Sequence, residues 1–204
     1  MLSFLMACIQ LDPLTMVKTG GYIGIALLVF AESGLLIGMF LPGDSLLFAA
    51  GLLSANGYLA LGPLMLVIVT AAILGDSAGY WFGANVGDNL FKRKNSRFFK
   101  QEYLERTERF YHKYGGRTLI LARFVPIVRT LAPILAGASR MKYGKFISYN
   151  ALGGFLWGIG MTALGFSLGS AVPQSEEYIL PISLIIIAVS FLPVLINLAR
   201  GKRI

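Results

Sequence analysis

The chain has 204 residues, of which 56% are hydrophobic and 14% are charged, and its mean hydropathy is +0.70. This composition argues against a soluble globular domain and predicts an all-α integral membrane protein, organised as a single polytopic domain over residues 1–204. The formal net charge is +8, but nine of the 18 Lys and Arg residues lie between Lys92 and Arg117, and most of the others flank apolar segments. In a membrane protein such a distribution indicates topology rather than nucleic-acid binding.

The side chains that most often bind metals are scarce. Cys8 and His112 are each the only residue of their type, which excludes an intramolecular disulfide, a cysteine cluster and a histidine-rich metal site. We therefore expect no metal and no cofactor. No positive segment precedes the first apolar residues, so a cleaved signal peptide is not expected. Residues 1–20 contain Asp12, Pro13 and Gly20 and are too short and broken to span, so we expect an interfacial lead-in.

Residues 22–53 form one apolar run whose only charged side chains are Glu32 and Asp44. Pro42 and Gly43, near the centre of this run, are strong helix breakers. Irregular backbone at membrane depth is tolerated where it is buried in protein or faces water. We therefore predict a re-entrant hairpin of two short helices.

The next apolar run, residues 61–83, is long enough to span a membrane and carries Asp76 near its far end. Trp81 is interpreted as an interfacial anchor. Residues 88–117 follow, with nine basic and four acidic side chains and with aromatic residues at helical spacing. This section predicts either an amphipathic helix in the headgroup layer or a solvated helical connector on the protein's own surface.

Residues 117–142 place two arginines and two prolines inside an otherwise apolar run. Arg123 and Arg129 are six residues apart, so a regular helix would point them about 120° away from each other. Pro126 and Pro133 remove backbone donors and are expected to break this helix. Ionisable groups at membrane depth usually mark a substrate or ion pathway, so the stretch is a candidate for half of a transport site.

Basic residues set the predicted topology. Two further spans are expected at residues 146–169 and 178–199, with an acidic loop between them and a basic C-terminus after them. Because Lys and Arg favour the cytoplasmic side, loop 88–117, the basic cluster at 140–145 and the C-terminus should all be cytoplasmic. This is consistent only if residues 117–142 enter and leave the membrane on the same side, as a second re-entrant hairpin.

The same reasoning makes the first hairpin enter from the opposite face. The expected fold class is therefore an inverted repeat of two re-entrant hairpins, with about three full spans. Local sequence supports the repeat weakly, and chance similarity is the alternative. The paired stretches are FLPGD at 40–44 with FVPIVR at 124–129, an Ala-Gly pair at 50–51 with another at 136–137, and GYWFG at 79–83 with GFLWG at 154–158, the last pair several residues out of register.

Five ionisable groups lie within apolar sequence: Glu32, Asp44, Asp76, Arg123 and Arg129. They either neutralise one another as buried ion pairs that fix one hairpin to the other, or they form a functional site. In the functional interpretation Arg123 and Arg129 bind a phosphate headgroup, because the planar guanidinium fork matches phosphate oxygens. Glu32 and Asp44, removed from water, could exchange protons and couple them to transport. Asp76 ranks below the other four.

Three of the polar or aromatic residues have simpler interpretations. Asp44 could instead cap a short helix that begins at Ser45. Asn150 is a secondary site candidate whose preferred role is a hydrogen bond to a neighbouring helix. Trp157 lies near the middle of its span, where packing is the expected role, and the glycines at 153–160 are expected to allow close helix approach.

Taken together, these residues make the chain resemble the DedA family, bacterial membrane proteins that share the SNARE-associated or VTT domain with eukaryotic lipid scramblases. The resemblance covers about residues 20–170 and includes Glu32, FLPGD at 40–44 and ARFVPIVR at 122–129. The Arg-Phe-x-Pro-x-x-Arg core is its most specific part. The resemblance implies two hairpins that face each other, important acids at Glu32 and Asp44, and important arginines at Arg123 and Arg129.

The expected function is a flippase of the cytoplasmic (inner) membrane that moves a lipid phosphate carrier such as undecaprenyl phosphate. The resemblance also implies a link to proton motive force. The alternative is a proton-coupled exporter of small cations or drugs. An enzyme is not expected, because the sequence offers no base-activated nucleophile. The expected partners are the lipid phosphate, membrane lipids and protons, and a homo-oligomer is left open.

Overall fold

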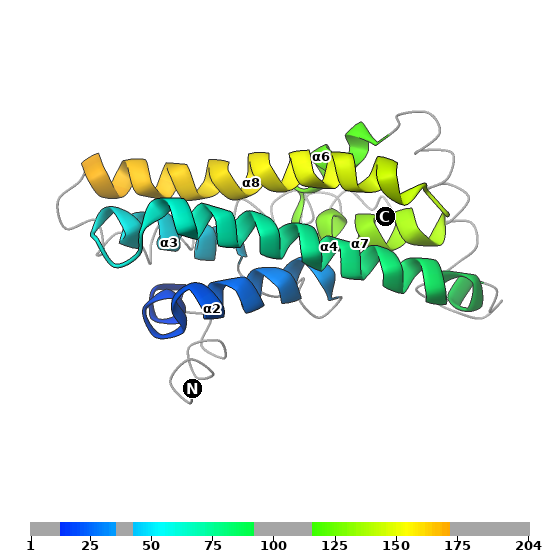
Figure 1. Ribbon diagram of the computed structural model, residues 1–204, viewed down its shortest axis with the longest axis horizontal. Helices are drawn as coiled ribbons and strands as arrows, with labels where there is room; N and C mark the ends of the chain where they lie inside the picture. The colour runs from blue at the N-terminus through cyan, green and yellow to red at the C-terminus, as the bar shows by residue number, and fades with distance from the viewer. Residues whose placement is uncertain (1–12, 36–42, 92–115, 172–204) are drawn as a thin grey trace, which may run out of the picture. The chain divides into compact units, whose positions relative to one another are not determined.

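A computed structural model describes residues 13–35, 43–91 and 116–171 (Figure 1). These residues form six helices and no strand, so the all-α prediction is confirmed for this part of the chain. The helices are α2 (Pro13–Gly34), α3 (Gly43–Ala55), α4 (Leu61–Phe91), α6 (Arg117–Ala122), α7 (Pro126–Ala138) and α8 (Tyr143–Ala171).

Three of these helices are long and apolar enough to cross a membrane, at Leu14–Gly34, Leu61–Val86 and Tyr143–Ala171. They expose large apolar side chains such as Leu66 and Phe155, as expected where the surrounding solvent is lipid. The spans predicted at 61–83 and 146–169 correspond to α4 and α8. The span predicted at 178–199 lies outside the described residues.

Residues 13–20, expected to be part of an interfacial lead-in, are helical and form the part of α2 that precedes a kink at Gly21. Pro13 suits the first position of a helix, where its missing N–H is not needed. The helical geometry is interrupted at Gly21, with φ 53° and ψ −152°, a conformation that glycine adopts without steric penalty. Beyond this kink the helix continues to Gly34, within the apolar run predicted at 22–53.

α3 begins at Gly43, not at Ser45. Asp44 therefore lies inside the first helical turn, where a carboxylate is favoured by the helix dipole, and it is not the residue before the helix. Pro42 and the remainder of the expected turn lie outside the described residues. So does most of section 88–117, predicted to be an amphipathic helix in the headgroup layer or a solvated helical connector, although α4 extends into it as far as Phe91.

The predicted helix break at Pro126 is confirmed. α6 ends at Ala122, and α7 begins with Pro126 in its first turn. Val125, with φ −120° and ψ 109°, has the extended backbone that a following proline imposes. Pro133 was predicted to break the helix as well, but α7 runs through it. Helices in membranes tolerate proline where neighbouring groups satisfy the freed carbonyl.

The described residues belong to two compact units. One contains residues 13–27, 43–68 and 158–171, and the other contains residues 28–35, 69–91 and 116–157. α2, α4 and α8 each contribute residues to both.

In the first unit, α3 and α8 pack backbone against backbone. A Cβ atom added to Gly51 of α3 would overlap the carbonyl oxygen of Thr162 in α8, and one added to Gly165 of α8 would overlap the carbonyl oxygen of Phe48 in α3. Small residues permit such close helix approach in membranes. Any side chain at either glycine would push the two helices apart.

In the second unit, α7 and α4 pack in the same way. A Cβ atom on Gly137 of α7 would overlap the carbonyl oxygen of Tyr80 in α4, and one on Gly83 of α4 would overlap the carbonyl oxygen of Ile134 in α7. On each of these helices, the glycine and the contacted carbonyl are three residues apart, as they are on α3 and α8.

The two contact sets have the same pattern, so their residues can be compared position by position. Gly51 corresponds to Gly137, as the Ala-Gly pairs at 50–51 and 136–137 predicted. In the spans, however, Gly83 corresponds to Gly165 rather than to Gly158, so the GFLWG match is displaced by seven residues. Seven residues are about two helical turns, which leaves the two glycines on nearly the same helix face.

Candidate functional site

Four of the five candidate charged side chains lie in the second unit, and all four are buried. Glu32 comes from α2, Asp76 from α4, Arg123 from the break after α6, and Arg129 from α7. The fifth, Asp44, belongs to the first unit and is half-buried. The second unit therefore brings together two acids and two arginines in an apolar setting.

The break between α6 and α7 positions Arg123. Its backbone N–H donates to the carbonyl of Ile120 at 3.3 Å, and the next two residues make the same tight turn. This turn ends α6 before Val125 becomes extended. The side chain of Arg123 then lies against α4 and α8, where only 5% of it is exposed.

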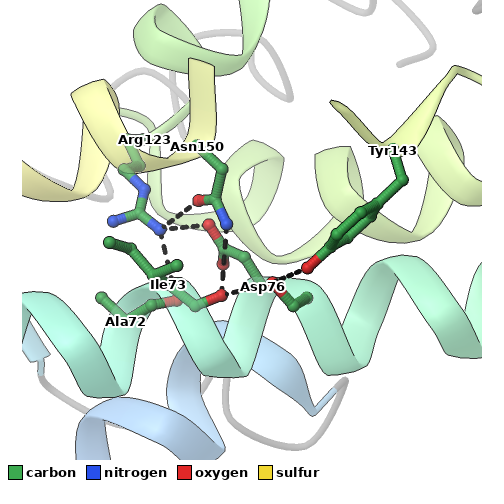
Figure 2. Close-up of polar contacts among 7 residues, drawn as sticks. Ala72, Ile73, Asp76, Arg123, Tyr143 and Asn150 are labelled. Carbon is green, nitrogen blue, oxygen red and sulfur yellow. Dashed lines mark hydrogen bonds and ion pairs between the residues drawn. The ribbon is translucent and has the colours of Figure 1, made fainter. Parts of the chain in front are cut away.

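The guanidinium group of Arg123 uses one nitrogen, Nη2, for its hydrogen bonds to other side chains and carbonyls of the described residues (Figure 2). Nη2 donates to a carboxylate oxygen of Asp76, to Oδ1 of Asn150 at 2.9 Å and to the carbonyl of Ala72 at 3.4 Å. The amide of Asn150 is held in turn, because its Nδ2 donates to the carbonyl of Ile73 at 3.2 Å. Arg123, Asp76 and Asn150 thus form one network between the helix break, α4 and α8.

Arg129 forms a second ion pair, with a carboxylate oxygen of Glu32. Both side chains are buried, which would be costly for either charge alone. Each arginine of the site therefore faces a different acid. Because these pairs join segments far apart in the sequence, no spacing rule could have assigned them.

Trp157 links the two arginines. Its ring lies 5.7 Å from Cζ of Arg123 and 5.1 Å from Cζ of Arg129, both within the range of cation–π attraction. The indole is 3% exposed, so these contacts are shielded from solvent. The packing role expected of Trp157 from its position in the span omitted this electrostatic contact with both cations.

Sequence spacing contained a signal for this part of the site. Asn150, Gly153, Gly154 and Trp157 follow the i, i+3, i+4, i+7 pattern of one helix face, and all four are buried. The glycines leave room for Arg123: a Cβ atom on Gly153 would lie 3.3 Å from its Cδ, and one on Gly154 would lie 2.8 Å from its Nη1. Asp76, which the sequence ranks below the other charges, contacts Arg123 directly.

An aromatic group adjoins the network in the second half of α4. Tyr143 donates to the hydroxyl oxygen of Ser77 at 3.2 Å, next in sequence to Asp76 (Figure 2). Tyr80 stacks on Phe146 with 4.6 Å between ring centroids and donates to the carbonyl of Met141. These contacts tie the start of α8 to α4. They thereby fix the face of α8 that carries Asn150.

Helices that can cross a membrane, apolar outer faces and a buried charged network define a multi-pass membrane protein. The VTT domain family model matches residues 41–167, and the chain belongs to this family, the DedA family of membrane proteins.

Curated relatives agree with this assignment. The chain is 43% identical to Protein DedA of Escherichia coli over 179 residues, which cover 87% of this chain and 81% of the relative. It is 44% identical over 201 residues to an uncharacterized membrane protein of Mycobacterium tuberculosis, covering 95% and 88%. It is 35% identical over 148 residues to the inner membrane protein YqjA of Escherichia coli, covering 72% and 67%. No solved structure matches the chain.

Proposed function

We propose that this protein is a flippase that moves a lipid phosphate across the cytoplasmic membrane, with undecaprenyl phosphate as the favoured carrier. The supporting observation is the pair of guanidinium groups buried against one indole ring at a helix break. Arginine remains charged at any accessible pH and binds phosphate oxygens through two parallel hydrogen bonds. Two such groups inside an apolar bundle suit a phosphate headgroup whose lipid tail remains in the membrane.

The ion pairs support a transport role over a purely structural one. Buried ion pairs add little stability relative to well-packed apolar residues, so holding helices together would not require four charges. A carboxylate, however, can neutralise an arginine when no phosphate is bound. Glu32 and Asp76 occupy this position on Arg129 and Arg123. We therefore add Asp76 to Glu32 as a residue that links protons to transport, and Asp44 stays a candidate from sequence.

The alternative, proton-coupled export of a small cation or drug, has less support. It needs carboxylates that are accessible to a cation, whereas Glu32 and Asp76 each face an arginine. Each arginine side chain would have to move away from its acid before a cation could bind there. We also propose a transporter rather than an enzyme, because the charged network includes no nucleophile beside a base.

We further propose that residues 22–53 and 117–142 are re-entrant hairpins that enter from opposite faces of the membrane. The equivalent glycine contacts of α3 with α8 and of α7 with α4 support a repeat with one such hairpin in each half. The break at Arg123 then supplies the irregular backbone that such sites require.

The proposed function is tested with purified protein in lipid vesicles and labelled undecaprenyl phosphate. We expect Arg123→Ala and Arg129→Ala each to reduce the rate of lipid movement by at least about tenfold, a loss equivalent to one hydrogen-bonded charge contact. Arg123→Lys and Arg129→Lys should fail nearly as badly, because an ammonium group cannot reproduce the two-pronged geometry.

Lys142→Ala is the matched control, since it removes an exposed positive charge outside the buried network. It should move lipid at the wild-type rate. Unchanged rates in both arginine-to-alanine variants would refute the proposed roles. Proton flux driven by a cation in vesicles that contain no polyprenyl phosphate would favour the exporter instead.

A further inference from the structure

The two terminal nitrogens of the Arg123 guanidinium group differ in their hydrogen bonding. Nη2 has three acceptors, Asp76, Asn150 and Ala72, whereas Nη1 is buried and has no hydrogen-bond partner among the described residues (Figure 2). A guanidinium group paired with a carboxylate commonly uses two parallel N–H groups. The ion pair of Arg123 with Asp76 uses a single nitrogen atom, Nη2. The N–H groups of Nη1 are therefore left for another hydrogen-bond acceptor.

Gly154 of α8 lies directly against this unused nitrogen. A Cβ atom at this position would be 2.8 Å from Nη1 and 3.4 Å from Cζ. Even the smallest side chain would therefore press on the guanidinium group and displace it. The absence of a side chain at Gly154 therefore lets the guanidinium group lie close against α8.

Arg123 would keep its place without Asp76. Asn150 accepts from Nη2 at 2.9 Å and is itself held by the carbonyl of Ile73. Trp157 lies 5.7 Å from Cζ, on the same helix as Asn150. Neither contact needs the carboxylate. The guanidinium can therefore exchange one anion for another without losing its position.

From these contacts, and resting on the proposed function, we infer that Arg123 is the first arginine to bind the phosphate group and that Asp76 is the internal anion that this phosphate displaces. The phosphate oxygen reaches Nη1 first. A second oxygen then replaces the Asp76 carboxylate on Nη2, which completes the two-pronged contact. Asp76 returns to Nη2 when the phosphate leaves, so Asp76 acts as a competitor that limits affinity and promotes release.

Binding can be measured through Trp157. The sequence contains two tryptophans, so Trp81→Phe leaves Trp157 as the only indole, in contact with both arginines. The full-length Trp81→Phe protein in detergent is titrated with a short-chain polyprenyl monophosphate, with inorganic phosphate and with the matching polyprenol. A response to both phosphate probes identifies a site for the phosphate group, and a response to the lipid probe alone identifies a site that also needs the tail. A response to the polyprenol as strong as that to its phosphate would overturn the inference.

Two substitutions should change the affinity in opposite directions. Asp76→Asn keeps the size of the side chain but removes its charge, so we expect about tenfold tighter binding of the polyprenyl phosphate. Gly154→Ala crowds Nη1, so we expect about tenfold weaker binding. Gly160→Ala is the control on the same helix, because a Cβ atom there meets nothing within 4 Å. It should bind like the parent.

Transport separates this inference from the proposed function. In vesicles, Asp76→Asn should lower the KM and also the maximal rate, because binding tightens and release slows. Wild-type transport with unchanged affinity in Asp76→Asn and Gly154→Ala would overturn the inference and leave the function standing. Phosphate binding with the expected affinity changes but no lipid movement would overturn the function alone. If neither binding nor transport occurs, both are wrong.

Discussion

Arg140 adopts a left-handed backbone conformation, with φ 55°, just after α7. Its N–H donates to the carbonyl of Gly137 at 3.0 Å, and the N–H of Met141 donates to the carbonyl of Ala136 at 3.1 Å. This is the helix-ending turn in which glycine is the usual residue, because a Cβ atom is strained at positive φ. The Cβ atom of Arg140 therefore carries a strain that glycine would not have at this position.

Replacement of Arg140 by glycine should therefore stabilise the protein by about 1 kcal/mol, the strain of a side chain in the left-handed region. The measurement is the thermal unfolding midpoint of purified protein in detergent. Arg140→Ala is the matched variant, since it removes the charge but leaves a Cβ atom at positive φ. If alanine stabilises as much as glycine, removal of the charge rather than relief of strain is the cause.

At the level of single residues, the sequence identified the charged side chains of the candidate site by their position in apolar runs. It did not show which of these side chains contact one another. Arg123, Arg129 and Glu32 stand out because charge is rare in apolar runs, and all three are buried. The contact between Arg123 and Asp76 depends on how a helix break meets α4, a tertiary relation with no local signal. Trp157 was assigned to packing for the same reason, because its two cationic neighbours come from distant segments.

At the level of helices, glycines set the distance between α3 and α8 and between α7 and α4. The closest approaches join backbone atoms, so these positions cannot accept a side chain without movement of a helix. The sequence matched the Ala-Gly pairs, but the close helix approach expected for the glycines at 153–160 differs from the structure, where Gly153 and Gly154 make room for the Arg123 side chain and a Cβ atom on Gly160 would meet nothing within 4 Å. The sequence could not show which helices would meet, because a glycine carries no partner preference of its own.

Gly51→Ala and Gly83→Ala should each lower the free energy of unfolding by about 2 kcal/mol, the cost of forcing an extra carbon into a close-packed contact. Gly62→Ala is the control on α4, because a Cβ atom there meets nothing within 4 Å. It should leave stability unchanged or raise it through better helix propensity. Denaturation in mixed micelles measures all three. Equal stability of Gly62→Ala and Gly83→Ala would show that the α4–α7 contact is not tight.

Prolines differ in how well sequence predicts their effect. Pro126 ends the preceding helix because it restricts Val125 to extended backbone, a strictly local constraint. Pro133 removes a single hydrogen bond inside α7, and α7 continues past it. Whether a helix survives that loss depends on its tertiary surroundings. The effect of Pro126 was therefore predictable from the sequence, and the continuation of α7 past Pro133 was not.

For the whole molecule, the distribution of Lys and Arg predicts that residues 55 and 139 lie on opposite sides of the membrane. The test uses single cysteines at Ala55 and Ser139 in a Cys8→Ser background, with a membrane-impermeant thiol reagent applied to intact cells and to inverted vesicles. We expect Ala55→Cys to react from outside and Ser139→Cys from the cytoplasmic side. Reaction of both from one side would contradict the double-hairpin topology.

The pairing of α3 with α8 has a consequence for biosynthesis. Thr162 and Gly165, the partners of Gly51 and Phe48, leave the ribosome long after α3 does. Contacts between such distant segments cannot form until the chain between them is complete. α3 is therefore without its partner through most of translation, and a chain truncated before α8 lacks the surface against which α3 packs.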